Sequence, residues 1–388
     1  MSPDTPTAPD TPDKASDDAF DAQVLAWHAW LDAHPEPAWE EDATTDYLVT
    51  ELEQLGIPTR RLEGRTGGFA ELGTGPLWVG VRADLDAIWM GEDDGYAVHS
   101  CGHSAHMAMA LGAMRLLAEG WQGGAGPDGV GVRLLLQPAE ETGAGAPELI
   151  RQGALEGMTH LFGMHVRPVE ELAVGRFGPA LHSGASTTAV VTLTGEEAHG
   201  SRPHLARSPI DALVALHQLL PTLRFAPGES YSAKLTRLRA GGRSLNVIPG
   251  TAEAAIDLRA QRNTVLEQLR DRITTGAQSI GATYGVDVEV TWSEATPGAE
   301  VHPEAAAIYA SAIREVAGED ALAEEIVTPG GDDFHHYSYG RPELRSALLA
   351  VGAGMDPGLH HPKVTYDTSV IATGARIIAR AVQLAAQA

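Results

Sequence analysis

The sequence predicts an α/β fold with a mostly parallel sheet and an inserted, ferredoxin-like α+β domain. Short apolar stretches, such as residues 77–81 and 130–136, alternate with helical patterns, which is typical of a parallel sheet. Polar motifs directly follow these stretches, where ligands bind in such sheets. From residue 184 the order of patterns changes to β-α-β-β-α-β, which indicates a separate unit.

The first domain is expected over residues 17–183 and 294–388, after a disordered acidic tail of residues 1–16 that is rich in Pro, Asp, Thr and Ser. Ser16 is the expected N-cap of the first helix, and a second helix is expected over residues 42–56. A strand over 77–81, a helix from about residue 105 to 120, a strand over 130–136 and a strand over 161–166 follow.

The inserted domain is expected over residues 184–293. Its predicted strands cover residues 189–193, 232–238, 252–258 and 286–292, and its predicted helices cover 210–220 and 265–280.

Composition excludes several classes of partner. The chain has 388 residues, is 43% hydrophobic and carries a net charge of −25, which argues against nucleic acid or an anionic membrane as partner. It lacks a long apolar run and a secretory signal pattern, and its single cysteine, Cys101, cannot form an intrachain disulfide, so we expect a cytoplasmic protein. The acidic, lysine-poor composition favours a salt-adapted (halophilic) host; a high-GC genome explains the Arg, Ala and Gly content but not so large a charge.

A run of histidines surrounds Cys101, from His99 to His106. A loop before a helix can direct Cys101 and His103 inward together, and the helix N-terminus favours a thiolate. The alternative is a buried cysteine beside loop histidines, but three histidines are poorly suited to an apolar core.

Three further motifs carry candidate ligands. Glu140 and Glu141 follow a predicted strand, although a solvated charge pair is an alternative; His165 ends another strand, where a core histidine is common; and His360 lies in what could be an exposed turn. In combination, one thiolate, several imidazoles and a carboxylate are what a divalent metal site needs. A neighbouring glutamate is what metal-assisted hydrolysis needs as a proton carrier.

The chain resembles the aminoacylase/carboxypeptidase family of dinuclear metallohydrolases, and within it the N-acyl-amino-acid amidohydrolases, which include hippurate hydrolase and auxin-amino-acid conjugate hydrolases. The matching segments run in order along the chain: His34-Pro-Glu36, Arg82-Ala-Asp84-Leu-Asp86-Ala, Ser100-Cys-Gly-His-Ser-Ala-His106, Gln137-Pro-Ala-Glu-Glu141, Gly163-Met-His165, His199-Gly-Ser-Arg-Pro-His204, Asn246-Val-Ile-Pro249, Asp332-Asp-Phe334 and Leu359-His-His-Pro362.

The resemblance implies two divalent metal ions, zinc or else manganese, cobalt or nickel. Cys101 would bridge them, with His103 and His165 completing one site and Glu141 and His360 the other. Glu140 would act as general base on a metal-activated water, and Asp84 would orient a ligand.

The resemblance also implies that the insert is a lid or dimerisation domain. His199 would stabilise the oxyanion in the partner subunit of a homodimer, and Asn246 and Arg259 would hold the substrate; for Arg259, surface pairing is an equally good account. The implied reaction is hydrolysis of the amide bond of N-acyl amino acids. Two alternatives stay open: a dipeptidase or carboxypeptidase on the same scaffold, and a catalytically silent metal-binding protein.

Three positions depart from the family pattern. Ser104 stands where Asp is usual, Asp332 stands where Glu is usual, and His182 replaces an apolar or small residue. A missing carboxylate at Ser104 is expected to change the hydrogen bonds beside the metals.

Overall fold

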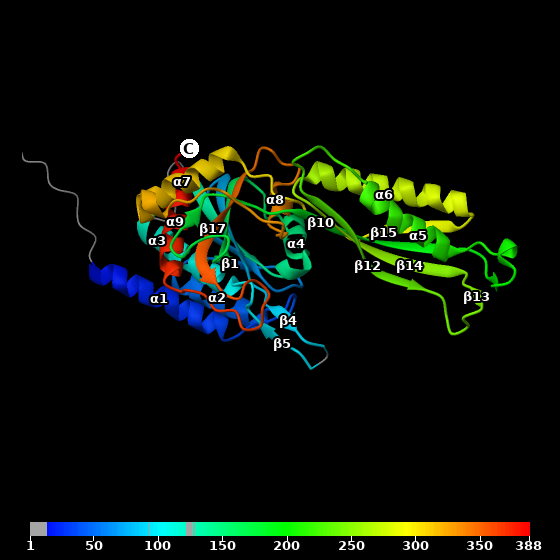
Figure 1. The fold of residues 1–388 in the computed structure, drawn as a ribbon. Helices are drawn as coiled ribbons and strands as arrows, with labels where there is room; N and C mark the ends of the chain where they lie inside the picture. The colour runs from blue at the N-terminus through cyan, green and yellow to red at the C-terminus, as the bar shows by residue number, and fades with distance from the viewer. Residues whose placement is uncertain (1–13, 93, 122–125, 127–128) are drawn as a thin grey trace, which may run out of the picture. The chain divides into compact units, whose positions relative to one another are not determined.

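The computed structural model describes residues 14–92, 94–121, 126 and 129–388 (Figure 1). The described residues within 1–180, 301–326 and 342–388 form one compact unit, and those within 181–300 and 327–341 form a second. Most of the tail predicted over residues 1–16 lies outside the described residues. Helix α1 (Lys14–Asp32) begins before Ser16, so Ser16 is not its N-cap.

The first unit is built on a seven-stranded sheet. Its strand order is β1 (Thr59–Arg61), β2 (Gly68–Leu72), β6 (Val130–Gln137), β3 (Leu77–Asp84), β7 (Met158–Pro168), β17 (Arg345–Met355) and β8 (Phe177–Gly178). The four strands from β6 to β17 are parallel, and β1, β2 and β8 pair antiparallel at the two edges. The parallel strands are buried along nearly their whole length, which explains their continuous apolar sequences.

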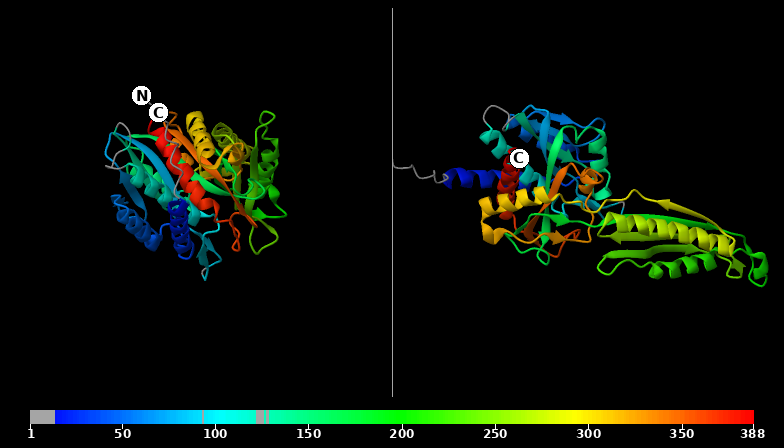
Figure 2. Two further views of the ribbon diagram at one scale, coloured as in Figure 1. Left: turned by 90° about the vertical axis from the view of Figure 1, so that its left-hand side faces the viewer. Right: turned by 90° about the horizontal axis from the view of Figure 1, so that it is seen from above.

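A layer of helices covers this sheet. Helix α3 (His103–Gly120) packs against β3 and lies between α1 and α9 (Val370–Ala385), which is red in Figure 2. Helix α7 (Pro303–Ala317) packs against α9 and β17. Side chains such as Leu111 and Met114 of α3 are fully buried, and each such burial contributes about 1.5–3 kcal/mol to folding.

Shorter elements complete the first unit. They are α2 (Asp42–Gln54), α4 (Gly145–Arg151) and the antiparallel hairpin of β4 (Ile88–Met90) and β5 (Tyr96–Val98). Of two further short strands, β9 (Leu181–His182) belongs to the second unit, and β16 (Ile326–Val327) includes the last residue of a first-unit segment. None of the helices in the described part of the chain combines the length and apolar character that crossing a bilayer requires.

The second unit is a four-stranded antiparallel sheet with two helices. Its elements follow the order β10 (Ala185–Thr194), α5 (Pro209–Leu219), β12 (Tyr231–Ala240), β14 (Thr251–Ala260), α6 (Asn263–Tyr284) and β15 (Asp287–Trp292), and the sheet order is β12-β14-β10-β15. Burial alternates along β10, as expected when only one face of the sheet is packed against helices. The unit also contains β11 (Ala198–His199), β13 (Val247–Ile248) and α8 (His335–Ser338).

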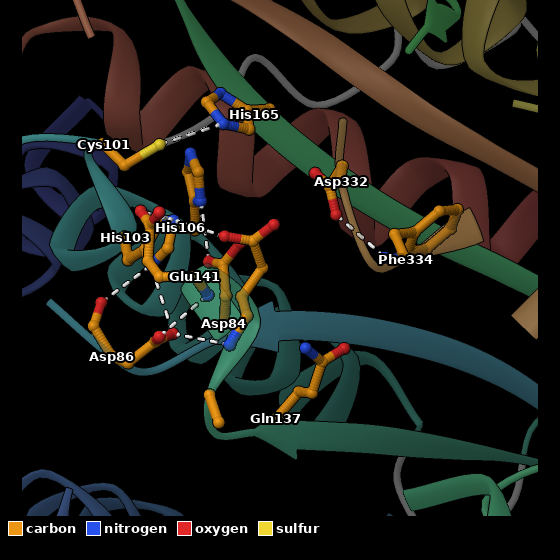
Figure 3. A network of polar contacts seen from close by, with 12 residues as sticks. Asp84, Asp86, Cys101, His103, His106, Gln137, Glu141, His165, Asp332 and Phe334 are labelled. Atoms are coloured by element: carbon orange, nitrogen blue, oxygen red, sulfur yellow. Dashed lines mark hydrogen bonds and ion pairs between the residues drawn. The ribbon is translucent and has the colours of Figure 1, made fainter. Parts of the chain in front are cut away.

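The sheet of the first unit explains where polar side chains gather. The neighbouring parallel strands β3, β6 and β7 end at Asp84, Gln137 and Pro168, so the segments that follow β3 and β6 start from the same edge. The loop before α3, which carries Cys101, and the segment with Glu140 and Glu141 meet there (Figure 3).

Candidate metal centre

Two groups of possible metal ligands share one sulfur atom. Ligand atoms of Cys101, His103 and His165 lie within 4.8 Å of one another, and the same holds for Cys101, Glu141 and His360. The Cys101 Sγ atom is 3.5 Å from Nε2 of His165, and Nε2 of His360 is 3.6 Å from a Glu141 oxygen. The structure therefore brings together all five residues that the sequence singled out as metal ligands.

The chain turns sharply between Cys101 and His103. Gly102 adopts the left-handed conformation, with φ of 88°, immediately before α3 begins. Both flanking side chains are buried, Cys101 in the loop and His103 in the first turn of the helix. A single glycine thus allows a cysteine and a histidine two positions apart to face the same point.

Backbone carbonyls orient both buried imidazoles. His103 Nδ1 is 2.7 Å from the carbonyl oxygen of Asp86, and His165 Nδ1 is 2.6 Å from the carbonyl oxygen of Val166. Each Nδ1–H donates to its carbonyl. The Nε2 atom of His165 then faces the Cys101 sulfur (Figure 3), and Nε2 of His103 lies 3.7 Å from a Glu141 oxygen.

His360 is held in an unusual backbone conformation. Its φ of 62° lies in the left-handed region, which costs a residue other than glycine about 1–3 kcal/mol. Its backbone N–H donates to the carbonyl of Ser100, 3.0 Å away, and so ties the C-terminal loop to the Cys101 loop. Such strain persists only where the surrounding structure fixes it.

In the absence of a cation, three of the five proposed ligands favour their protonated forms. Burial and the nearby Glu141 carboxylate raise the pKa of the Cys101 thiol well above its usual range. Burial raises the pKa of Glu141 to about 7. Burial lowers the pKa of His103, but the Asp84 carboxylate and the hydrogen bonds with Asp86 and Cys101 together outweigh it, so that this pKa lies well above the usual range. A divalent cation would displace these protons.

The side chains present fit such a cation. The buried Nε2 atom of His103 and the buried Oε1 atom of Glu141 form no hydrogen bond with any described residue. Buried polar atoms of this kind are rare unless a ligand or water satisfies them. One thiol, three imidazoles and carboxylates form a donor set suited to divalent transition metals.

His106 lies beside the cluster but is saturated. Its Nδ1 atom is 2.8 Å from Asp84 Oδ1, and its Nε2 atom accepts the backbone N–H of Val166 at 3.0 Å. With both nitrogens engaged it offers no lone pair to a metal. Asp84 also accepts a 2.5 Å hydrogen bond from Arg82, and its Oδ2 atom is 3.7 Å from His103 Nε2.

Glu140 reaches the same space as the ligands. One of its carboxylate oxygens lies 3.7 Å from Nε2 of His103, and Nε2 of His103 is also 3.7 Å from a Glu141 oxygen. Its side chain retains 12% of its surface exposed. A carboxylate in this place can exchange a proton with a small molecule beside the candidate metal ligands.

The sequence did not identify two carboxylates that support this segment. Asp86 accepts the backbone N–H groups of Glu140 and Glu141, each at 3.0 Å, and Glu41 accepts that of Ala139 at 2.8 Å (Figure 3 for Asp86). Asp86 lies in one of the motifs quoted above, but no feature of the neighbouring sequence indicates that it binds backbone amides. In the sequence, Glu41 looks like an ordinary acidic residue before a helix.

The structure also places a carboxylate beside Ser104. The Ser104 hydroxyl donates to Asp32 Oδ1 at 2.9 Å and lies 3.0 Å from the hydroxyl of Tyr366. Asp32, the last residue of α1, thus brings a carboxylate next to the position where the family pattern has an aspartate.

The remaining predicted residues lie in the second unit. His199 and Asn246 are both exposed, and their side-chain nitrogens are 3.5 Å apart. Arg259, on β14, is exposed and pairs with Asp257 at 3.2 Å. This pairing matches the alternative account of Arg259 as a surface residue.

Known proteins resemble the whole of this arrangement. The profile of the family described as "Peptidase family M20/M25/M40" matches residues 80–384. The N-acetyl-L-cysteine deacetylase of Bacillus subtilis is 30% identical over 91% of this chain and 85% of its own length. The IAA-amino acid hydrolase ILR1-like 2 of Arabidopsis thaliana is 29% identical over 79% of this chain and 72% of its own length.

A solved structure and a longer relative complete the comparison. The B. subtilis YXEP protein, described as a dinuclear metal binding peptidase, superposes with a TM-score of 0.77 at 25% identity over 95% of this chain and 99% of its own. A 31% identical protein of Rhodococcus jostii is named as a glutamate–cysteine ligase, but the chain spans only 46% of its length. The family match and the cluster of possible metal ligands both point to a metal-binding hydrolase. This chain belongs to peptidase family M20/M25/M40 and is a hydrolase, either an amidohydrolase or a peptidase.

Proposed function

We propose that this protein hydrolyses the amide bond of N-acyl amino acids in a reaction that depends on two divalent metal ions. The observation that carries the proposal is the pair of ligand groups that share Cys101, with Glu140 beside them. The deacetylase and conjugate-hydrolase names of the relatives support amino acids with an N-acyl group as the substrate class.

The proposed division of ligands follows the two groups. Cys101 serves both ions, His103 and His165 complete the first site, and Glu141 and His360 complete the second. When bound, the ions would polarise the scissile carbonyl and lower the pKa of water.

Glu140 is the proposed general base. Its carboxylate accepts a proton from the attacking water and then donates it to the nitrogen of the leaving amino acid. The carboxylate lies 3.7 Å from Nε2 of His103 and is not a member of the two groups that share Cys101. Asp84 acts indirectly: it accepts a hydrogen bond from His106, and its negative charge raises the pKa of His103.

We further propose that the inserted domain, residues 184–293, acts as lid and dimerisation domain of a homodimer. His199 would donate a hydrogen bond to the developing oxyanion in the partner subunit's site, a contact that contributes about 3–4 kcal/mol in comparable enzymes. Asn246, adjacent to His199, would hold the substrate with Arg259. An obligate monomer with full activity would remove the role of His199.

A dipeptidase or carboxypeptidase reaction on the same scaffold is the second candidate. The peptidase description of the similar B. subtilis structure favours it. The two reactions share the metal ions and Glu140 and differ in the group that the pocket accepts on the amide carbonyl.

The test is amine release from N-acetyl, N-benzoyl and longer N-acyl amino acids and from dipeptides, with zinc, manganese, cobalt or nickel added at low and high KCl. The wild type is compared with Glu140→Gln and with Glu119→Gln, a matched control in an exposed pair with Arg115. We expect turnover that chelation abolishes, that Glu140→Gln lowers about 10²–10⁴-fold and that Glu119→Gln leaves unchanged.

The outcomes separate the candidates. Turnover of N-acyl amino acids alone supports the amidohydrolase, and turnover of dipeptides alone supports the peptidase. A folded, metal-loaded protein that turns over no member of the panel would contradict both and favour the silent metal-binding protein.

A further inference from the structure

Three consecutive backbone amides before and within the Glu140–Glu141 pair are bound by carboxylates. The N–H of Ala139 donates to Glu41, and those of Glu140 and Glu141 donate to the two oxygens of Asp86. Glu41 is 98 residues away along the chain from Ala139, and Asp86 is 54 residues away from Glu140. The backbone of this segment is therefore fixed by side chains from two other parts of the first unit.

The segment needs such fixing because its conformation is unfavourable. Ala139 adopts φ of 54° and ψ of 40°, in the left-handed region that alanine rarely occupies. Ala139 is also fully buried, so an unbound N–H at this position would have no water to bind. The turn at Ala139 sets the direction in which the two following side chains leave the backbone.

Glu41 does not cap the helix that begins next to it. It is the N-cap residue of α2, yet its side chain makes no capping hydrogen bond. Glu36 caps the helix instead, since its two carboxylate oxygens accept hydrogen bonds from the N–H groups of Ala43 and Thr44 at 3.0 and 2.7 Å. The Glu41 carboxylate is fully buried and turns away from its own helix to Ala139.

Glu41 is itself anchored. Its second oxygen accepts a short hydrogen bond from the buried Thr66 hydroxyl. Both oxygens of a carboxylate with no exposed surface are thus engaged, one by the anchor and one by the amide of Ala139. Burying a carboxylate costs folding free energy, so its presence calls for a role beyond packing.

We propose that Glu41 is a positioning residue that acts through Ala139 to aim Glu140 and Glu141 at the metal centre. Asp86 positions the same segment together with Glu41. Its side chain accepts hydrogen bonds from the next two backbone amides, and its carbonyl oxygen orients His103. The proposal rests on the proposed function, in which Glu141 is a metal ligand and Glu140 the base.

Two substitutions at position 41 separate geometry from charge. Glu41→Gln keeps an oxygen at the Ala139 amide and loses the charge, whereas Glu41→Asp keeps the charge and withdraws the oxygen by one methylene. Positioning predicts that Glu41→Gln binds metal nearly as tightly as the wild type. It predicts that Glu41→Asp binds metal about 10–100-fold more weakly, as is typical of lost support for a ligand.

Glu36→Asp is the matched control. It shortens by one methylene a glutamate five positions earlier whose carboxylate also accepts two hydrogen bonds, but from backbone N–H groups of α2 rather than from Ala139 and Thr66. We expect it to lower the thermal midpoint like Glu41→Asp and to leave metal affinity unchanged. A merely structural role of Glu41 would make the two variants alike in both measurements.

The measurements are zinc and manganese affinity by competition with a chromogenic chelator, the thermal midpoint, and hydrogen exchange of the amides of residues 139–141 in the metal-free protein. We expect these amides to be protected in the wild type and in Glu41→Gln, and faster exchange at Ala139 in Glu41→Asp. Equal metal affinity of Glu41→Asp and wild type, or weak binding by Glu41→Gln, would overturn the proposal.

The same data distinguish this inference from the proposed function. A folded wild type that binds neither metal would refute the metal centre itself. A wild type that binds metal, with Glu41→Asp matching Glu36→Asp, would refute only the role of Glu41. If Glu41→Asp does not fold, exchange in the wild type decides: an unprotected Ala139 amide would overturn the proposal.

Discussion

Replacing Gly102 by alanine should damage the metal centre more than any other single methyl group added to the Cys101 loop. Gly102 has φ of 88°, and a Cβ atom there would lie 2.3 Å from Cγ2 of Val166. The substitution therefore combines an unfavourable backbone conformation with an overlap of atoms, and it does so between two proposed ligands, Cys101 and His103.

Both costs can be estimated. A left-handed conformation costs alanine about 1–2 kcal/mol, and inserting a methyl group into a packed core costs about 1–3 kcal/mol. The free energy of unfolding should fall by about 2–5 kcal/mol in total, if the two costs add. Val166→Ala removes the overlapping Cγ2 atom, so in the double variant only the backbone cost of Gly102→Ala should remain.

Urea denaturation of the metal-free wild type, the two single variants and the double variant measures this coupling. We expect Gly102→Ala to cost about 1–3 kcal/mol less in the Val166→Ala background than in the wild type. Metal affinity should fall in both proteins that carry Gly102→Ala, because alanine destabilises the left-handed turn between Cys101 and His103 in both. A cost of Gly102→Ala below about 1 kcal/mol, or strictly additive single effects, would refute the reasoning.

Three other predictions concern stability. Ser104→Asp should lower the thermal midpoint, because it sets a second carboxylate against Asp32, and adding Asp32→Asn should restore it; a stabilised Ser104→Asp would contradict this. Burial raises the pKa of Glu41 to about 7. The stability contributed by its protonated form is therefore full below about pH 4.5 and is lost as pH rises through 7. In urea denaturation from pH 5 to 8, the free energy of unfolding should change less for Glu41→Gln than for the wild type, by up to about 3 kcal/mol. Tyr309→Phe should cost about 1–2 kcal/mol in the same assay, because the fully buried Tyr309 hydroxyl donates to the carbonyl of Gly163 at 2.8 Å.

Local patterns predicted three of the four parallel strands at the centre of the first unit, and β17 was not predicted. Apolar stretches became the buried parallel strands β3, β6 and β7, and the polar motifs after them meet at one edge of the sheet. The antiparallel edge strands β1 and β2 were not predicted. They are short, and β1 is largely exposed, so neither has a long apolar run that would reveal it.

The five proposed ligands could be named from the sequence because each lies in a motif with unusual chemistry. The residues that hold these motifs in place could not be named in the same way. Glu41 and Asp32 read as ordinary acidic residues beside helices, and their roles arise from contacts with Ala139 and Ser104 that lie 98 and 72 residues away along the chain. Such contacts depend on how the helices pack on the sheet, which local periodicity does not encode.

The Ser104 substitution illustrates the same point. The sequence indicated a missing carboxylate beside the metals, with weaker metal binding as the expected consequence. The structure shows that Asp32 brings a carboxylate to the Ser104 hydroxyl from α1. We therefore expect the metal centre to tolerate Ser104, and the roles of the second unit, the homodimer and the salt-adapted host stay predictions.

The most direct test of the account is anomalous X-ray scattering from crystals of the zinc-loaded protein, recorded above and below the zinc edge. The account predicts two zinc peaks on either side of the Cys101 sulfur, one within reach of His103 and His165 and the other within reach of Glu141 and His360. It also predicts that Glu140→Gln retains both peaks. A single peak away from Cys101, or zinc bound directly by Glu140 in place of Glu141, would contradict the proposed division of ligand and base.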